Sequence, residues 1–171
     1  MDYSEASKLL RYDEVTGALY WLSDMRVGFK GSVLAHKAGD LAKCKRKDGR
    51  SVVRLKGKLY MAYRVAWLLK TGAWPAGEID HKNGDSSDDS FKNLRDVSRR
   101  TNTENRHAAN SKKLSSKFLG VYANKANRSQ PWRALISANG KQISLGAFDT
   151  EEEAYAAYLG AKRVIHSGCT L

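Results

Sequence analysis

The strongest constraint on this chain of 171 residues is a carboxylate and an imidazole that stand side by side, at Asp80 and His81, directly before a polar turn. Adjacent residues on a β-strand point to opposite faces of the sheet. The two side chains can therefore serve one site only if the strand ends or bends there, and Asn83-Gly84-Asp85 supplies such a break. We expect a short strand that ends at this pair.

The residue types in this stretch suit the hydrolysis of a phosphodiester bond. A neutral imidazole, whose ordinary pKa is about 6.5, is a natural base near neutral pH. Mg²⁺ is a natural stabiliser of the charge that builds up on the phosphate, and it binds a few hard oxygen ligands while it keeps several waters. Asp80 offers a carboxylate oxygen, and Asn102 offers an amide oxygen that adds no negative charge. The pattern predicts a one-metal site that cuts a nucleic-acid backbone.

Several spaced residues of this stretch resemble the HNH nuclease motif, in the branch found in phage and intron homing endonucleases: Asp80-His81, Gly84-Asp85, Asn93-Leu94 and Asn102. That family folds the motif as two strands and a helix around one metal ion. The resemblance implies that His81 is the general base and that Asp80 and Asn102 bind Mg²⁺, for which Mn²⁺ can substitute. It also implies that Asn93 hydrogen-bonds across the loop, holding it and orienting the histidine. The alternative is a surface turn with a chance Asp-His pair.

The net charge of +12 and the sequence pI near 9.8 point to a polyanionic partner. Nucleic acid is favoured over a membrane, because the longest apolar run, Val65 to Leu69, is too short to span a bilayer. The N-terminus does not resemble a signal peptide. Cys44 and Cys169 lie far apart without CxxC spacing, which argues against a zinc knuckle and for a reducing, cytoplasmic setting. The resemblance adds that the gene is phage-encoded and that the protein acts in the bacterial host.

The region before the motif predicts a short helix and a β-rich segment. Residues 4–12 predict a helix with Ser4 as its N-cap. Strand-like runs over 41–46, 51–55 and 59–63 are separated by glycine turns, which is typical of antiparallel hairpins. Their many lysines and arginines fit either a solvated sheet face or phosphate contact. Residues 64–71 predict a helix that stops at Gly72, and residues 91–98 a second short strand before a helix capped by Ser98.

The last 55 residues, 117–171, look like a separate module after a small, polar and basic linker at 109–116. Strands are predicted over 118–122, 132–137 and 141–146, with Asn139-Gly140 as a hairpin turn and a helix capped by Asp149 or Thr150. The residues Gly120-Val121, Trp132-Arg133-Ala134, Leu145-Gly146 and Phe148-Asp149-Thr150 resemble the AP2/ERF-type DNA-binding domain. In that family a three-stranded antiparallel sheet, backed by one helix, enters the DNA major groove.

Two sets of residues are candidates for DNA contact. Arginines around the motif have planar donor forks that suit phosphate oxygens, although surface solvation is the alternative. Residues of the C-terminal module follow by position from the resemblance, and alternation along the strand puts only one of Trp132 and Arg133 outward unless a bulge intervenes. The candidates are Arg95, Arg99, Arg100, Arg106, Tyr122, Lys125, Arg128, Trp132, Arg133, Lys141 and Gln142.

The sequence therefore predicts an α+β chain with an HNH nuclease domain at 1–108, in which an antiparallel sheet precedes a ββα-metal core, and an AP2/ERF-like domain at 117–171. The expected function is metal-dependent cleavage of double-stranded DNA. No membrane or small-molecule cofactor is expected, and a monomer or weak dimer should nick one strand. The alternative is a DNA-binding regulator with a non-functional HNH site. An RNA-binding protein is a weaker alternative, because no motif that stacks RNA bases on aromatic side chains is present.

Overall fold

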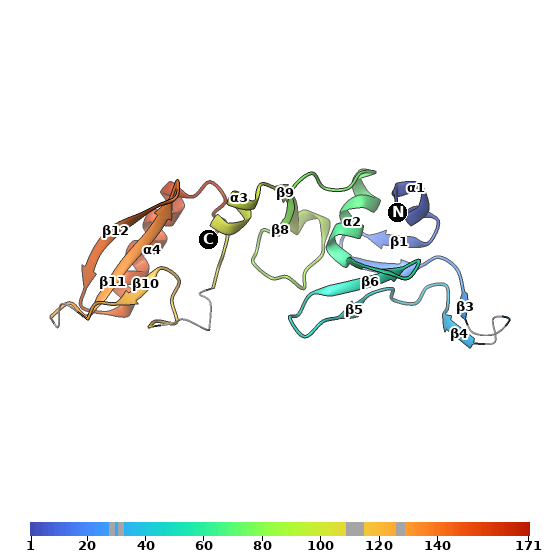
Figure 1. Cartoon of the computed structure of the whole chain (residues 1–171), viewed down its shortest axis with the longest axis horizontal. Helices are drawn as coiled ribbons and strands as arrows, with labels where there is room; N and C mark the ends of the chain where they lie inside the picture. Colours follow the sequence, from blue (N-terminus) through green and yellow to red (C-terminus); the bar gives the residue numbers. More distant parts are fainter. Residues whose placement is uncertain (28–29, 31–32, 109–114, 126–128) are drawn as a thin grey trace. The chain divides into compact units, whose positions relative to one another are not determined.

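The computed structural model of the chain describes residues 1–27, 30, 33–108, 115–125 and 129–171 (Figure 1). It combines a few helices with small antiparallel sheets, which confirms the predicted mixed α+β class. Most of the predicted linker, and Arg128, lie outside the described residues. The chain forms two compact units, Met1–Ser98 and Arg99–Leu171. Residues 99–108, which are predicted to belong with the nuclease motif, thus lie in the second unit, and the functional domain boundaries remain predictions.

The first unit begins with helix α1 (Tyr3–Ser7), which is shorter than the helix predicted over 4–12. Asp2 rather than Ser4 is the N-cap: its side chain accepts from the Glu5 amide, while the Glu5 carboxylate accepts from the Asp2 amide. The chain then enters strand β1 (Leu10–Asp13), which pairs with β2 (Ala18–Trp21). Leu10 is buried in this hairpin, and tertiary packing of this kind overrides a local preference for helix.

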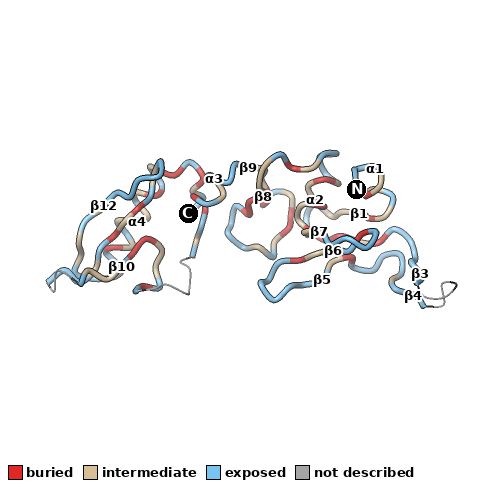
Figure 2. The backbone as a smooth tube through the Cα atoms, in the orientation of Figure 1, coloured by how far each residue is buried: buried red, intermediate tan, exposed pale blue. Residues whose placement is uncertain are grey.

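Two further hairpin systems follow in the first unit. Strands β3 (Met25–Val27) and β4 (Val33–His36) pair in a segment that shows no strand signal in the sequence. Strands β5 (Cys44–Lys45), β6 (Ser51–Leu55) and β7 (Lys58–Met61) form the predicted three-stranded sheet, although β5 is only two residues long. Figure 2 shows buried residues where α2 meets this sheet.

Helix α2 (Ala62–Thr71) supplies the centre of the first unit. It ends as predicted at Gly72, whose positive φ of 84° is a left-handed conformation that glycine adopts without steric cost. One side of α2 packs on the N-terminal strands through Ala62 and Val65. Another side packs, through Ala66, on Ile79 and Leu94 of a separate hairpin.

This hairpin pairs β8 (Glu78–His81) with β9 (Leu94–Val97), and a 3₁₀ turn, η2 (Phe91–Asn93), precedes β9. The register sets Asp80 opposite Arg95 and His81 opposite Leu94. Since Ile79 and Leu94 pack on α2, the alternation of side chains turns His81 toward the helix and Asp80 to the other face. The loop between residues 81 and 91 is rich in polar residues, among them Asn83, Asp85, Asp88 and Asp89.

The second unit starts with helix α3 (Arg99–Glu104) and contains the predicted three-stranded sheet and helix. Strands β10 (Val121–Ala123), β11 (Trp132–Ala138) and β12 (Lys141–Phe148) are antiparallel. Helix α4 (Glu151–Ile165) packs on one face of the sheet and begins with a capping box formed by Thr150 and Glu153. The AP2/ERF resemblance of this unit remains a prediction.

The last residues of the chain hold the C-terminal end of α3. The Glu104 carboxylate is buried and accepts hydrogen bonds from the Arg100 side chain, the Ser167 hydroxyl and the Gly168 amide. Burial raises the pKa of Glu104, but these donors outweigh burial and leave the pKa below its ordinary value. Lys162 of α4 is buried and donates to the carbonyl of Arg106.

Within the described residues, no helix combines the length and the apolar character needed to cross a lipid bilayer.

Candidate active site

Strand β8 ends at the Asp-His pair, as the sequence predicts. The chain reverses immediately: the Gly84 amide donates to the His81 carbonyl at 2.9 Å, and Gly84 has a φ of 74°. The Lys82 amide donates to the Asn93 carbonyl at 2.9 Å, so the ends of the loop stay paired. The pair therefore sits on a rigid strand end rather than in a mobile turn.

Asp80 is buried, at 6% exposure, and forms an ion pair with the arginine opposite it in the hairpin. Its Oδ2 accepts from Nε of Arg95 at 2.8 Å and lies 2.7 Å from a terminal nitrogen of the same guanidinium. Charge-assisted bonds of this kind are strong and directional. Arg95 is predicted to contact DNA, and the structure gives its guanidinium a second use, fixing Asp80. The DNA contact itself remains a prediction.

His81 is also buried, at 8% exposure, and its ring is held from two sides. The Tyr63 ring meets it edge-on, with 5.3 Å between ring centroids. Nε2 of His81 lies 3.2 Å from Oδ1 of Asp89. Tyr63 is thus a packed aromatic of α2, and its neighbour in space is the predicted general base.

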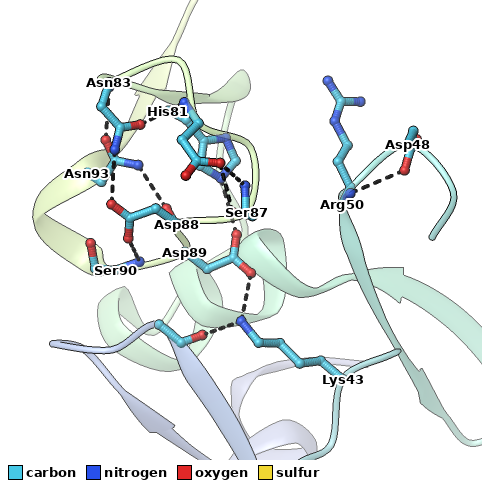
Figure 3. A network of polar contacts seen from close by, with 12 residues as sticks. Lys43, Asp48, Arg50, His81, Asn83, Ser87, Asp88, Asp89, Ser90 and Asn93 are labelled. Atoms are coloured by element: carbon cyan, nitrogen blue, oxygen red, sulfur yellow. Dashed lines mark hydrogen bonds and ion pairs between the residues drawn. The ribbon is translucent and has the colours of Figure 1, made fainter. Parts of the chain in front are cut away.

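Asp89 is a residue of this site that sequence reasoning missed. Its carboxylate is 1% exposed and contacts two side chains, because Oδ1 faces His81 while Oδ2 lies 3.3 Å from Nζ of Lys43 (Figure 3). The only sequence signal is its place in an acidic loop that also contains Asp85 and Asp88, and nothing in that run distinguishes the buried member.

The N-terminal hairpin holds the backbone of Asp89 as well. The Tyr12 hydroxyl donates to the Asp89 carbonyl at 2.7 Å. Burial first, and the Asp89 charge second, raise the pKa of the Tyr12 phenol, so the hydroxyl remains a neutral donor over the physiological range. The contact joins residues that are 77 positions apart in the chain.

Asn93 is buried and bridges the loop, the contact that the resemblance implied (Figure 3). Its Oδ1 accepts from the Asn83 amide at 3.0 Å, and its Nδ2 donates to the Asp88 carbonyl at 2.8 Å. The Asp88 carboxylate accepts in turn from the Ser90 amide and the Asn83 side chain. The orienting effect on His81 remains a prediction.

The predicted metal ligands belong to different compact units, since Asp80 lies in the first and Asn102 in α3 of the second. Their donor chemistry fits the predicted ion, because a buried carboxylate and an amide oxygen suit a hard cation that keeps most of its waters. Among the residues that the structure describes, no three His, Cys, Asp or Glu side chains gather as a metal site.

The other candidates for DNA contact lie in the second unit. Arg99, Arg100 and Arg106 are exposed, and the first two line an open cavity of about 500 Å³ beside the Asn139-Gly140 turn. Arg100 is also bound to Glu104, with Nε 2.8 Å from Oε1. These positions leave the arginine forks accessible to a phosphate, and the contact remains a prediction.

The sheet resolves which strand residues point outward. Tyr122 and Arg133 are opposite each other in the register, and both are exposed on the face away from α4. Trp132 alternates to the other face and packs on the core cluster of Val121, Ala134 and α4. Of the two neighbours, Arg133 is therefore the one that a groove could reach. Lys125, Lys141 and Gln142 are exposed.

Residues 60–104 match the model of a family described as HNH endonuclease. This segment includes Asp80, His81, Asn93 and Asn102, and it spans helix α2, the β8–β9 hairpin and α3. No curated protein and no solved structure matches the chain. The family match supports an HNH nuclease that acts on DNA.

Proposed function

We propose that the protein is an HNH endonuclease of the phage or homing type, which uses one divalent metal ion to hydrolyse a phosphodiester bond of duplex DNA. One observation carries the proposal: the segment that matches the family holds a buried Asp80-His81 pair at a strand end, closed over by a loop that Asn93 bridges. Both side chains are buried, His81 on the α2 face of the hairpin and Asp80 on the other, and an ordinary surface turn has no reason to bury either of them.

In the proposed reaction, His81 takes a proton from a water molecule whose oxygen forms a bond to phosphorus. The bond from phosphorus to the 3′ oxygen breaks in line with the attack, and the departing 3′ oxygen gains a proton from solvent. A bound Mg²⁺, with Mn²⁺ as a substitute, supplies positive charge at the phosphate and at the leaving oxygen. Asp80 and Asn102 would hold this ion, and the ion pair with Arg95 would keep Asp80 in one orientation.

DNA binding is proposed to involve the outer face of the C-terminal sheet and the arginines around the motif. Tyr122, Arg133 and Gln142 are exposed on that sheet, and the chain carries a surplus of 12 positive charges. Affinity for duplex DNA should therefore fall steeply as salt rises, because bound counterions are released. One site per chain implies that a monomer nicks, so a double-strand break needs a dimer or two visits.

The test is nicking of supercoiled plasmid DNA from a plausible host or phage, with Mg²⁺ and with a chelator. His81→Ala should lower the cleavage rate by roughly a hundredfold or more, the usual range for a lost general base, while DNA affinity is unchanged. His36→Ala is the matched control, because His36 stacks on Trp21 away from the loop. Cleavage by His81→Ala at the wild-type rate would refute the mechanism.

The ion pair between Asp80 and Arg95 favours a second candidate function. A carboxylate committed to a guanidinium could instead mark a DNA-binding regulator whose nuclease site no longer works. Binding of duplex DNA that is independent of metal, together with no cleavage of any DNA tested, would favour the regulator.

A further inference from the structure

We propose that Asp89 is the positioning residue of His81 and that Lys43 holds Asp89 in place for that task. The proposal rests on the proposed function, since it assigns a role relative to the general base. Lys43 lies outside the segment that matches the HNH family, so the family likeness alone gives no reason to look for it.

The carboxylate of Asp89 is divided between two partners. Oδ1 of Asp89 lies 3.2 Å from Nε2 of His81, and Oδ2 lies 3.3 Å from Nζ of Lys43 (Figure 3). With 1% exposure, Asp89 is out of reach of water, and a buried carboxylate persists only where charged or hydrogen-bonding groups compensate it. Lys43 supplies the compensating charge and leaves the other oxygen to the imidazole.

The N-terminal region fixes this carboxylate and its backbone from several directions. Lys43 also donates to the Gly17 carbonyl at 3.1 Å, and the Phe91 amide donates to the Glu14 carbonyl at 2.9 Å. Gly17 has a φ of 73°, and a Cβ there would lie 2.4 Å from the backbone carbon of Asp89. The turn between β1 and β2 thus packs closely against the loop between residues 81 and 91. The N-terminal region acts in this proposal as the support of the general base.

The contact between Asp89 and His81 also has a chemical consequence for the imidazole. A carboxylate that accepts from Nε2–H selects the tautomer in which Nδ1 is the basic nitrogen, and it also fixes the plane of the ring. Aspartate performs this service for histidine in hydrolases of unrelated folds. Asp89 would therefore act through His81 and touch no substrate, which makes it a positioning residue.

The proposal is tested with the full-length protein by measuring two quantities for each variant, the rate of DNA cleavage and the affinity for the DNA substrate. Asp89→Ala should lower the single-turnover cleavage rate by about 10- to 100-fold, as for groups that orient ligating histidines, and leave the substrate KM unchanged. Asp89→Asn has nearly the same volume, but its amide oxygen should turn to the Lys43 ammonium and its NH2 group to Nε2 of His81, which selects the wrong tautomer, so it should be as slow as Asp89→Ala. Lys43→Met should lie between wild type and Asp89→Ala.

The matched control is Asp88→Asn. Asp88 belongs to the same loop and bonds Asn83 and Ser90, but its side chain is not the one that contacts His81. A loop effect without positioning would make Asp88→Asn as slow as Asp89→Ala and would overturn the proposal. An Asp89→Ala rate equal to wild type would overturn it as well.

The tautomer of His81 provides a readout that needs no variant of Asp89 to fold. Nitrogen NMR of histidine-labelled wild type at about pH 8, where imidazole is ordinarily neutral, should show His81 protonated on Nε2; the signal is assigned by its loss in His81→Ala. Protonation on Nδ1 instead would refute the role of Asp89. If the wild type cleaves no DNA, the proposed function fails, and this spectrum still decides whether Asp89 positions the ring.

Discussion

Replacement of Asn93 by alanine should open the loop between residues 81 and 91 without unfolding the rest of the protein. The side chain makes two hydrogen bonds, to the Asn83 amide at 3.0 Å and to the Asp88 carbonyl at 2.8 Å. Each is a neutral bond with a net contribution of about 1 kcal/mol. Their joint loss should reduce the free energy of loop opening by about 2 kcal/mol, which is roughly a 30-fold rise in the open population.

Amide hydrogen exchange is the measurement, because local opening of a loop controls its exchange protection. Protection of the amides at Lys82 and Asn83 should fall by the same factor of roughly 30, while amides of the β11–β12 pair in the other unit should be unchanged. Asn124→Ala is the matched control: Asn124 also bonds a backbone carbonyl, that of Gln130, but in the second unit. Loop protection in Asn93→Ala equal to wild type would show that Asn93 does not hold the loop.

Three further predictions concern the second unit. Gly120→Ala should destabilise this unit by about 3 kcal/mol, because φ of Gly120 is 79° and a Cβ would lie 2.0 Å from the Tyr158 ring. Thermal unfolding followed by circular dichroism measures the effect, and an unchanged unfolding midpoint would contradict the prediction. The lowered pKa of Glu104 stabilises the fold above the ordinary carboxyl pKa of 4.5, and this contribution is lost as pH falls through the lowered value. The free energy of unfolding, measured with urea, should therefore fall less with acidification in Glu104→Gln than in wild type. Equal slopes of this free energy against pH would refute the assignment. Arg133→Ala should weaken the binding of duplex DNA by about tenfold or more in a fluorescence anisotropy titration, whereas Arg163→Ala on α4 should not. Equal affinities of Arg133→Ala and wild type would show that the outer face of the sheet does not bind DNA.

Local signals in the sequence predicted the elements that neighbouring residues control. Gly72 ends α2 because a left-handed residue is needed there, and Asn139-Gly140 turns the hairpin with positive φ at both residues. Thr150 caps α4 through a bond to the Glu153 amide. The strand end at His81 belongs to the same class. In each case the chemistry that determines the conformation lies within a few residues.

Other predictions failed or stayed open because distant residues decide them. The helix predicted over 4–12 gives way to β1 at Leu10, since pairing with β2 buries that residue better than a helix would. Strands β3 and β4 carry no clear alternating pattern, so pairing alone reveals them. Alternation along the strand shows only that Trp132 and Arg133 point to opposite faces of the sheet. Which of them is exposed depends on the face that α4 covers.

The motif and its chemical character were thus determined by the sequence, because the spacing of Asp80, His81 and Asn93 is itself the signal. The tertiary structure decided what surrounds them. Asp89 meets His81 across a folded loop, and Lys43 reaches Asp89 from 46 residues earlier in the chain. Such pairs depend on which buried charges the packing brings together, and in the linear sequence a buried carboxylate looks the same as an exposed one.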